Sequence, residues 1–158
     1  MRQRHIDRVR RFYQNNRQEL YVYALSICRD PDLAEDSIQT AFFGLLRRRS
    51  PPRDIRPFVF RSIRNAIIDA HRADSTRKHT NDSAPDMTEG ENGPIRDRTL
   101  NQCLALLNDH QRETIVLKAF VGLTFAEIGR VMNEPANTIA SRYRRGMARM
   151  REVLENQI

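Results

Sequence analysis

Five arginines and several small polar residues lie close together near the end of the chain, in a segment with the chemistry of a DNA contact. The segment 137–151 contains these five arginines and no acidic residue. With about 100° between successive residues of a helix, its polar and basic residues gather on one face and its flank. This set consists of Asn137, Thr138, Ser141, Arg142, Arg144, Arg145 and Arg149. Amides and hydroxyls suit base edges in the major groove and arginines suit phosphates, so duplex DNA is the expected ligand.

The preceding residues have the spacing of a helix-turn-helix, an element that places a helix in the major groove. Thr124 and Glu127 form the pattern of a capping box at the start of a first helix. Gly129 and Asn133 suit a close helix crossing and a left-handed turn, and Pro135 suits the first turn of the second helix. A basic helix taken alone is more often a solvated surface, but the turn reverses these odds.

The second helix of this motif also has an apolar face, which we expect to pack in a core. That face contains Ile139, Tyr143, Gly146, Met147, Met150, Val153 and Leu154. Earlier helices are indicated by an apolar pattern from Leu100 to Leu107 and by a cap at Asn108, with an end at Gly122. The C-terminal part is therefore expected to be a small bundle of about four helices, of which the last binds DNA.

Residues 47–78 form a second basic region, with ten lysines and arginines against three acidic residues. Asp54 is expected to cap a helix here, with Pro57 in its first turn. One sector of that helix contains Val59, Ile63, Ala66, Ile67 and Ala70, and the other contains Phe58, Arg61, Asn65, Ile68, Asp69 and Arg72. Basic groups interleaved with an aromatic suit unstacked single-stranded bases. The alternative is a solvated helix in which Phe58 turns inward.

Between these regions and the N-terminus, a helix is predicted from Pro31 to about Arg48, with Asp30 as its cap. Its buried sector contains Ala34, Ile38, Ala41, Phe42 and Leu45, and the opposite sector contains Asp32, Asp36, Gln39, Thr40, Phe43 and Arg47. Phe43 should therefore face solvent. An exposed Phe among acids and an amide is either a lone surface aromatic or the centre of a protein-binding patch, and this helix alone does not decide.

Composition agrees with a nucleic-acid partner. The chain has 158 residues, a net charge of +7 and a pI near 10.2, which favour a polyanion. No run of about 18 apolar residues could span a bilayer, and the N-terminus lacks an apolar signal core, so we expect a cytoplasmic protein without membrane insertion. Cys28 and Cys103 are expected to be reduced core residues. The four histidines have no ligand spacing, and we expect neither a metal nor another cofactor.

The chain divides by composition into two helical parts. Residues 4–28 suit one helix, or two with an interruption near Asn15 and Asn16. Residues 79–97 are rich in Asn, Asp, Ser, Gly and Pro, which indicates a flexible acidic linker. We therefore expect an all-α protein with two small helical domains, 1–78 and 98–158, joined by the linker 79–97.

These features together resemble the extracytoplasmic-function (ECF) group of bacterial sigma-70-type sigma factors over nearly the whole chain. Residues 34–42, AEDSIQTAF, are similar to the region 2 helix that binds core RNA polymerase. The following helix, from Phe58 to Arg72, is similar to the one that melts promoters and reads the minus-ten element. Residues 107–117, then GLTFAEIG at 122–129 and TIASR at 138–142, are similar to region 4, which binds the minus-thirty-five element.

The resemblance implies a role for each candidate surface. The polymerase-binding residues would be Asp32, Asp36, Gln39, Thr40 and Phe43. The residues for the melted minus-ten strand would be Arg49, Arg53, Phe58, Arg61, Asn65, Asp69 and Arg72, with an unpaired base held at the 49–56 loop near Asn65. Members of this group are often restrained by an anti-sigma partner, which would cover one or both basic faces. Phe58 stands where the family often has Trp, Ala140 stands where it often has a basic residue, and the 49–54 loop is short.

The predicted function is that of a promoter-specificity subunit without catalysis of its own, which brings core RNA polymerase to promoter DNA. A transcriptional regulator that binds duplex DNA without recruiting polymerase is the alternative, and it would need neither exposed Phe43 nor the basic face of residues 54–72. A third hypothesis makes Asp32, Glu35 and Asp36 a metal-dependent nuclease site. Acidic residues at a helix N-terminus are common for dipole reasons alone, so this hypothesis is the weakest.

Overall fold

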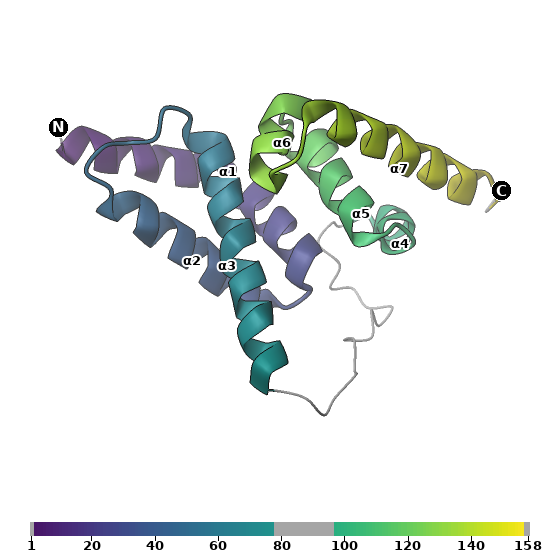
Figure 1. The fold of residues 1–158 in the computed structure, drawn as a ribbon, viewed down its shortest axis with the longest axis horizontal. Coiled ribbons are helices and arrows are strands. Elements are labelled where there is room, and N and C mark those ends of the chain that lie inside the picture. Colours follow the sequence, from purple (N-terminus) through teal and green to yellow (C-terminus); the bar gives the residue numbers. More distant parts are fainter. Residues whose placement is uncertain (1, 78–96, 157–158) are drawn as a thin grey trace. The chain divides into compact units, whose positions relative to one another are not determined.

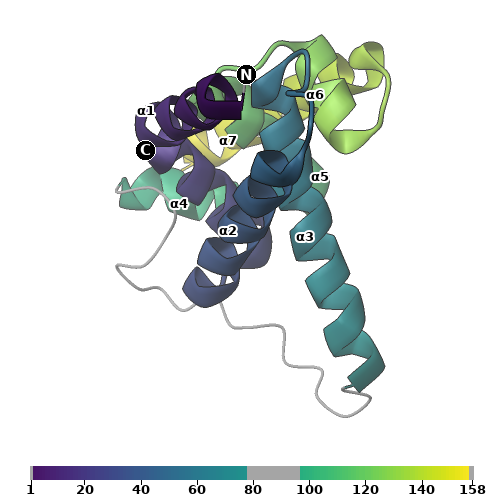
Figure 2. The ribbon, with the colours of Figure 1, turned by 90° about the vertical axis from the view of Figure 1, so that its left-hand side faces the viewer.

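A computed structural model describes residues 2–77 and 97–156, and every regular element in them is a helix. The chain forms two compact units, one up to Asn81 and one from Asp82 onward. Figure 1 shows the helices of both units, and Figure 2 shows the same ribbon turned by 90°. The predicted all-α fold is confirmed. The predicted linker lies outside the described residues except for Asp97.

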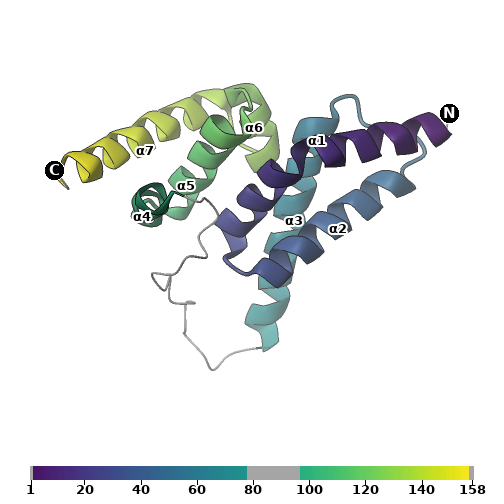
Figure 3. The ribbon, with the colours of Figure 1, turned by 180° about the vertical axis from the view of Figure 1, so that it is seen from behind.

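The first unit contains three helices, α1 (Arg2–Cys28), α2 (Pro31–Arg47) and α3 (Ile55–Arg77), each packed against the other two. Figure 3 shows α1 and α2 side by side and α3 crossing them. Helix α1 runs without a break, so the alternative prediction of two helices interrupted near Asn15 and Asn16 is wrong. The Asn16 Nδ2 donates to the Phe12 carbonyl oxygen at 2.9 Å, which satisfies the amide within the helix.

The core of the first unit is built from large side chains of all three helices. The most deeply buried are Leu20, Tyr23, Leu45, Phe60, Ile63 and Ile67. The rings of Tyr23 and Phe60 meet edge to face with centroids 5.4 Å apart. Phe60 was not in the predicted buried sector of its helix, whereas Ala66 and Ala70 of that sector are only partly buried. The buried face of α3 is therefore rotated toward Phe60 relative to the face that the sequence predicted.

Helix α2 is positioned by local signals. The Asp30 carboxylate accepts from the backbone N–H groups of Asp32 and Leu33, and Pro31 occupies the first helical position. The predicted buried sector is confirmed, because Ala34, Ile38, Ala41, Phe42 and Leu45 are all buried. Both the start of α2 and its rotation are thus set by the sequence of this segment, which leaves the opposite sector facing solvent.

The second unit contains α4 (Arg98–Ala105), α5 (Asp109–Ile115), the π-helix η1 (Val116–Val121), α6 (Phe125–Met132) and α7 (Ala136–Asn156). Asp97, which was assigned to the linker, is the N-cap of α4, and its carboxylate accepts from the Leu100 N–H. The buried Arg112 joins α5 to the end of α4: its guanidinium donates to the carbonyl oxygens of Leu104 and Leu107, both at 2.9 Å.

The predicted helix-turn-helix is present in α6 and α7. Thr124 and Glu127 form both hydrogen bonds of the capping box. Asn133 has φ 56°, and the Glu134 N–H donates to the Gly129 carbonyl oxygen at 2.9 Å. A Cβ on Gly129 would lie 2.5 Å from the Glu134 carbonyl oxygen, so the turn requires glycine there. Pro135 directly precedes α7 rather than lying in its first turn.

The predicted core face of α7 is confirmed near the turn and wrong at the far end. Ile139, Gly146 and Met150 are buried, whereas Leu154 is 41% exposed. Figures 1 and 3 show the last turns of α7 projecting past α4 and α5. The helix is longer than the partners that could cover it, so its periodic apolar pattern continues into solvent.

Candidate nucleic-acid interface

The proposed DNA-binding face of α7 is open to solvent along most of its length. Asn137, Thr138, Arg144, Arg145 and Arg149 are exposed, and Ser141 and Arg142 are partly buried. A concave pocket of about 560 Å³ lies beside this face, and α7 and α5 both line it. The face is therefore not flat, because the start of α5 forms a second wall.

The arginines of this face differ in their partners. Arg142 forms an ion pair with Glu134 of the turn, its side chain is 16% exposed and that of Glu134 is 30% exposed. Arg149 lies 3.3 Å from the Glu152 carboxylate at an exposed site. Within residues 97–156, Arg144 and Arg145 form no ion pair. Helical periodicity could not find the Arg142 partner, because Glu134 lies across the turn.

The second basic region lies on α3 and on the loop before it. Arg49, Arg53, Arg61, Asn65, Asp69 and Arg72 are all exposed. Phe58 is partly buried, and the Arg48 guanidinium lies over its ring, 4.8 Å from the centroid. The Arg48 Nε also donates to the Ser50 carbonyl oxygen at 3.3 Å. Phe58 is thus neither fully exposed nor fully buried. Its contact with Arg48 was not predicted from the sequence.

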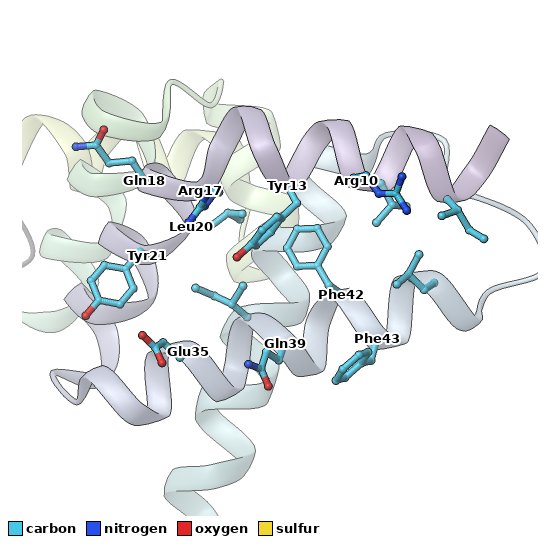
Figure 4. Close-up of a pocket in the computed structure, with 14 residues that line it drawn as sticks. Arg10, Tyr13, Arg17, Gln18, Leu20, Tyr21, Glu35, Gln39, Phe42 and Phe43 are labelled. Atoms are coloured by element: carbon cyan, nitrogen blue, oxygen red, sulfur yellow. The ribbon is translucent and has the colours of Figure 1, made fainter. Parts of the chain in front are cut away.

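The outward sector of α2 lies as predicted, with Asp32, Asp36, Gln39, Thr40 and Phe43 all exposed. Phe43 is 57% exposed. It borders a groove of about 820 Å³ between α1 and α2, whose lining includes Tyr13 and Leu46. Figure 4 shows the Tyr13 and Phe42 rings next to each other between the helices, where they meet edge to face, and Phe43 on the outer side of α2. Phe43 is therefore part of an apolar surface that continues onto α1, not a lone aromatic.

The two cysteines and His5 are buried in the cores of the units. Cys28 and Cys103 are buried free thiols, as predicted, and burial raises the pKa of both. His5 is buried, and its Nε2 lies 2.9 Å from the Leu45 carbonyl oxygen. Across the described ranges, no three His, Cys, Asp or Glu side chains gather as metal ligands. In the same residues no helix is long and apolar enough to cross a membrane.

Comparison with known proteins assigns a family to both units. Residues 12–77 match the family model of sigma-70 region 2, and residues 97–150 match that of sigma-70 region 4. The RNA polymerase sigma factor CarQ of Myxococcus xanthus is 30% identical over 135 residues, which cover 80% of this chain and 77% of CarQ. The ECF RNA polymerase sigma factor ShbA of Streptomyces griseus is 26% identical over 135 residues, which cover 78% of this chain and 71% of ShbA.

A solved structure has the same fold. The sigma factor RpoE of Bartonella quintana, in complex with the anti-sigma factor NepR, superposes with a TM-score of 0.66 at 22% identity, covering 91% of this chain and 96% of that one. A region 2 bundle followed by a region 4 helix-turn-helix defines a sigma-70-type transcription initiation factor. This chain belongs to the ECF group of that family and is an RNA polymerase sigma factor. The duplex-only regulator is accordingly not favoured.

Proposed function

We propose that the two units divide promoter recognition between them. Region 2 and its flanks, residues 1–78, bind core RNA polymerase and hold the melted minus-ten strand. Region 4, residues 98–158, binds the minus-thirty-five duplex, and residues 79–97 link the two. The chain performs no catalysis, needs no cofactor and acts in the cytoplasm, where it directs the polymerase to its promoters.

The observation that carries this proposal is the outward sector of α2. Phe43 is more than half exposed although the buried sector of the same helix is fully packed, so the fold does not need it there. Asp36 and Gln39 lie on the same sector and supply polar groups around the apolar ring. Large aromatics surrounded by polar groups are typical hot spots of protein interfaces. The partner assigned to this surface is core polymerase.

DNA contacts are assigned by chemistry within each unit. On α7, we assign base edges to Asn137, Thr138 and Ser141, and phosphates to the exposed arginines, because these are the groups that their side chains suit. On the first unit, the exposed arginines around Phe58 suit the phosphates of a single strand. The Arg48 guanidinium already covers one face of that ring, so base stacking on Phe58 would use its other face or its edge.

An anti-sigma factor is also proposed as a partner. The related RpoE structure contains one, NepR, bound to the sigma factor. A restraining partner would cover the α2 sector or one of the basic faces, since these are the surfaces that polymerase and promoter need. Its binding would then compete with core polymerase, which a competition pull-down measures directly.

Substitution of Phe43 tests the polymerase surface. Phe43→Ala should weaken binding to core polymerase by about tenfold or more, because truncating an interface hot spot costs roughly 2 kcal/mol. Leu106→Ala is the matched control, because Leu106 is an equally exposed apolar residue, at 56%, in the second unit. Binding of labelled chain to core polymerase by fluorescence anisotropy gives both affinities. Equal affinities for Phe43→Ala and wild type would remove Phe43 from the interface.

Run-off transcription tests the function as a whole. Core polymerase on a genomic fragment library should start at a new set of sites when this chain is added, and the shared upstream sequence of those sites identifies the promoter. Phe43→Ala should reduce transcription from all of them alike. If the chain left the choice of start sites unchanged, the division of promoter recognition proposed above would be wrong.

A further inference from the structure

The start of α5 lies against the DNA-binding face of α7, although the two segments are about thirty residues apart in sequence. His110 and Gln111 form one wall of the pocket there, and Asn137, Ser141 and Arg145 lie on the other. None of the sequence patterns that predicted a DNA contact included His110 or Gln111. The pocket is an open hollow lined by polar and basic residues, which a protruding group of a ligand could enter.

The two walls are held together by a close helix contact. A Cβ built on Gly146 would lie 2.7 Å from the Ile115 Cδ1 and 3.5 Å from the Gln111 Cβ. Glycine at this position of α7 therefore lets α5 approach closely enough for Gln111 to border the pocket. Gly146 is buried, and a side chain there would displace the Ile115 side chain from the contact between the two helices.

Hydrogen bonds also hold the backbone of the first turn of α5, which forms this wall of the pocket. The Gln111 N–H donates to the Asn108 Oδ1 at 2.8 Å, and the Thr114 hydroxyl donates to the His110 carbonyl oxygen at 2.8 Å. Arg112 ties the same turn to the end of α4. Side chains on this wall thus project from a rigid backbone, so they are pre-positioned for a ligand and binding requires little ordering.

The charges at the pocket favour an anion. Arg145 has no ion-pair partner in the described part of the unit, whereas the neighbouring Arg142 is held by Glu134. The nearby carboxylate of Asp109 is 88% exposed and lies 3.0 Å from the Arg112 Nη1, so its charge is compensated. The imidazole of His110, the amide of Gln111 and the Arg145 guanidinium can all donate hydrogen bonds. An oxyanion is the ligand that accepts from all three.

We infer that this pocket receives a backbone phosphate of duplex DNA, with His110 and Gln111 of α5 as contacts additional to those of α7. The inference rests on the proposed role of α7 as the duplex reader. A phosphate contact is independent of base sequence, so it sets the register of α7 in the groove rather than the choice of promoter. Reading the duplex thus involves two helices of region 4, α5 and α7.

The experiment measures the affinity of the full chain for a labelled mixed-sequence duplex by fluorescence anisotropy. His110→Ala removes one hydrogen-bond donor from the α5 wall, so it should lower affinity a few-fold. Gln111→Glu keeps the shape and places a negative charge in the pocket, so it should lower affinity on the order of tenfold. Gln102→Ala, at an exposed position of α4 outside the pocket, is the control and should bind as wild type. Thermal unfolding of each variant verifies that the unit stays folded.

Arg145→Ala separates this inference from the proposed function. If Arg145→Ala weakens binding while His110→Ala and Gln111→Glu match wild type, α5 does not contact DNA and the pocket assignment is overturned. If Arg145→Ala also binds as wild type, the duplex-reading role of α7 fails as well. Weaker binding of both His110→Ala and Gln111→Glu supports a phosphate in the pocket.

Discussion

At the scale of the residue, identical side chains on α7 have different tasks because their partners differ. Arg142 is mostly buried and paired with Glu134, whereas Arg144 is exposed and forms no ion pair within the described residues. A shielded ion pair contributes little net stability, but removing one partner leaves the other charge without compensation. Arg142 therefore joins the turn to α7, whereas Arg144 is exposed and available to the phosphate proposed above.

This difference is measurable through the salt dependence of DNA binding. Arg144→Ala should reduce the slope of log affinity against log salt by about 0.9, the value for one lost phosphate contact. Arg142→Ala should change the slope less and should lower the thermal stability of the unit, because the ion pair between the turn and α7 is lost. Anisotropy titrations at several salt concentrations give the slopes. Equal slope changes for both variants would show that Arg142 leaves Glu134 to bind DNA.

At the scale of the element, the helix-turn-helix is held by the backbone of its turn. The Gly129 backbone accepts from the Glu134 N–H, and its Cα lies too close to the Glu134 carbonyl for any side chain. Glu134 is thereby fixed where it meets Arg142 of α7. Glycine at position 129 thus permits the close packing of the turn, and Glu134 of that turn pairs with Arg142.

Two glycine substitutions in helices should have opposite effects. Gly129→Ala should lower the free energy of unfolding of the second unit by about 1–3 kcal/mol, because its Cβ would overlap the turn. Gly44→Ala in α2 is the matched control: its Cβ meets nothing within 4 Å, so alanine should stabilise the helix by roughly 0.5–1 kcal/mol. Urea unfolding followed by circular dichroism measures both. A neutral Gly129→Ala would mean that the turn can open at little cost.

At the scale of the whole molecule, the two units belong to one chain with a net charge of +7. Each unit has its own core and its own basic surface. Two sites on one tether bind more tightly than either alone when both can engage the same ligand.

Separation of the units should therefore weaken promoter binding without abolishing recognition of the upstream element. The full chain with core polymerase should bind a promoter on the order of 100-fold more tightly than an equimolar mixture of residues 1–78 and 98–158 with the same polymerase. On a duplex that carries only the upstream element and without polymerase, the fragment 98–158 should match the full chain within a few-fold. Equal promoter affinities for mixture and chain would show that the tether contributes nothing.

The sequence by itself determined the features that depend on neighbours within a few residues. The caps at Asp30, Asn108 and Thr124, the left-handed turn at Asn133 and the exposure of Phe43 all follow from helical periodicity and local hydrogen bonding. The order of the two units and their family were also readable from short motifs. These signals are local, so a linear pattern contains them.

Tertiary structure decided which side chains meet across helices and turns. The pairing of Arg142 with Glu134, the cover of Phe58 by Arg48 and the burial of Phe60 were not predicted, and neither was the exposure of Leu154. The pocket between α5 and α7 likewise depends on how the two helices pack, with Gly146 against Ile115 and Gln111. Each of these depends on the distance and rotation between packed elements, and periodicity fixes the rotation of a helix only approximately and its neighbours not at all.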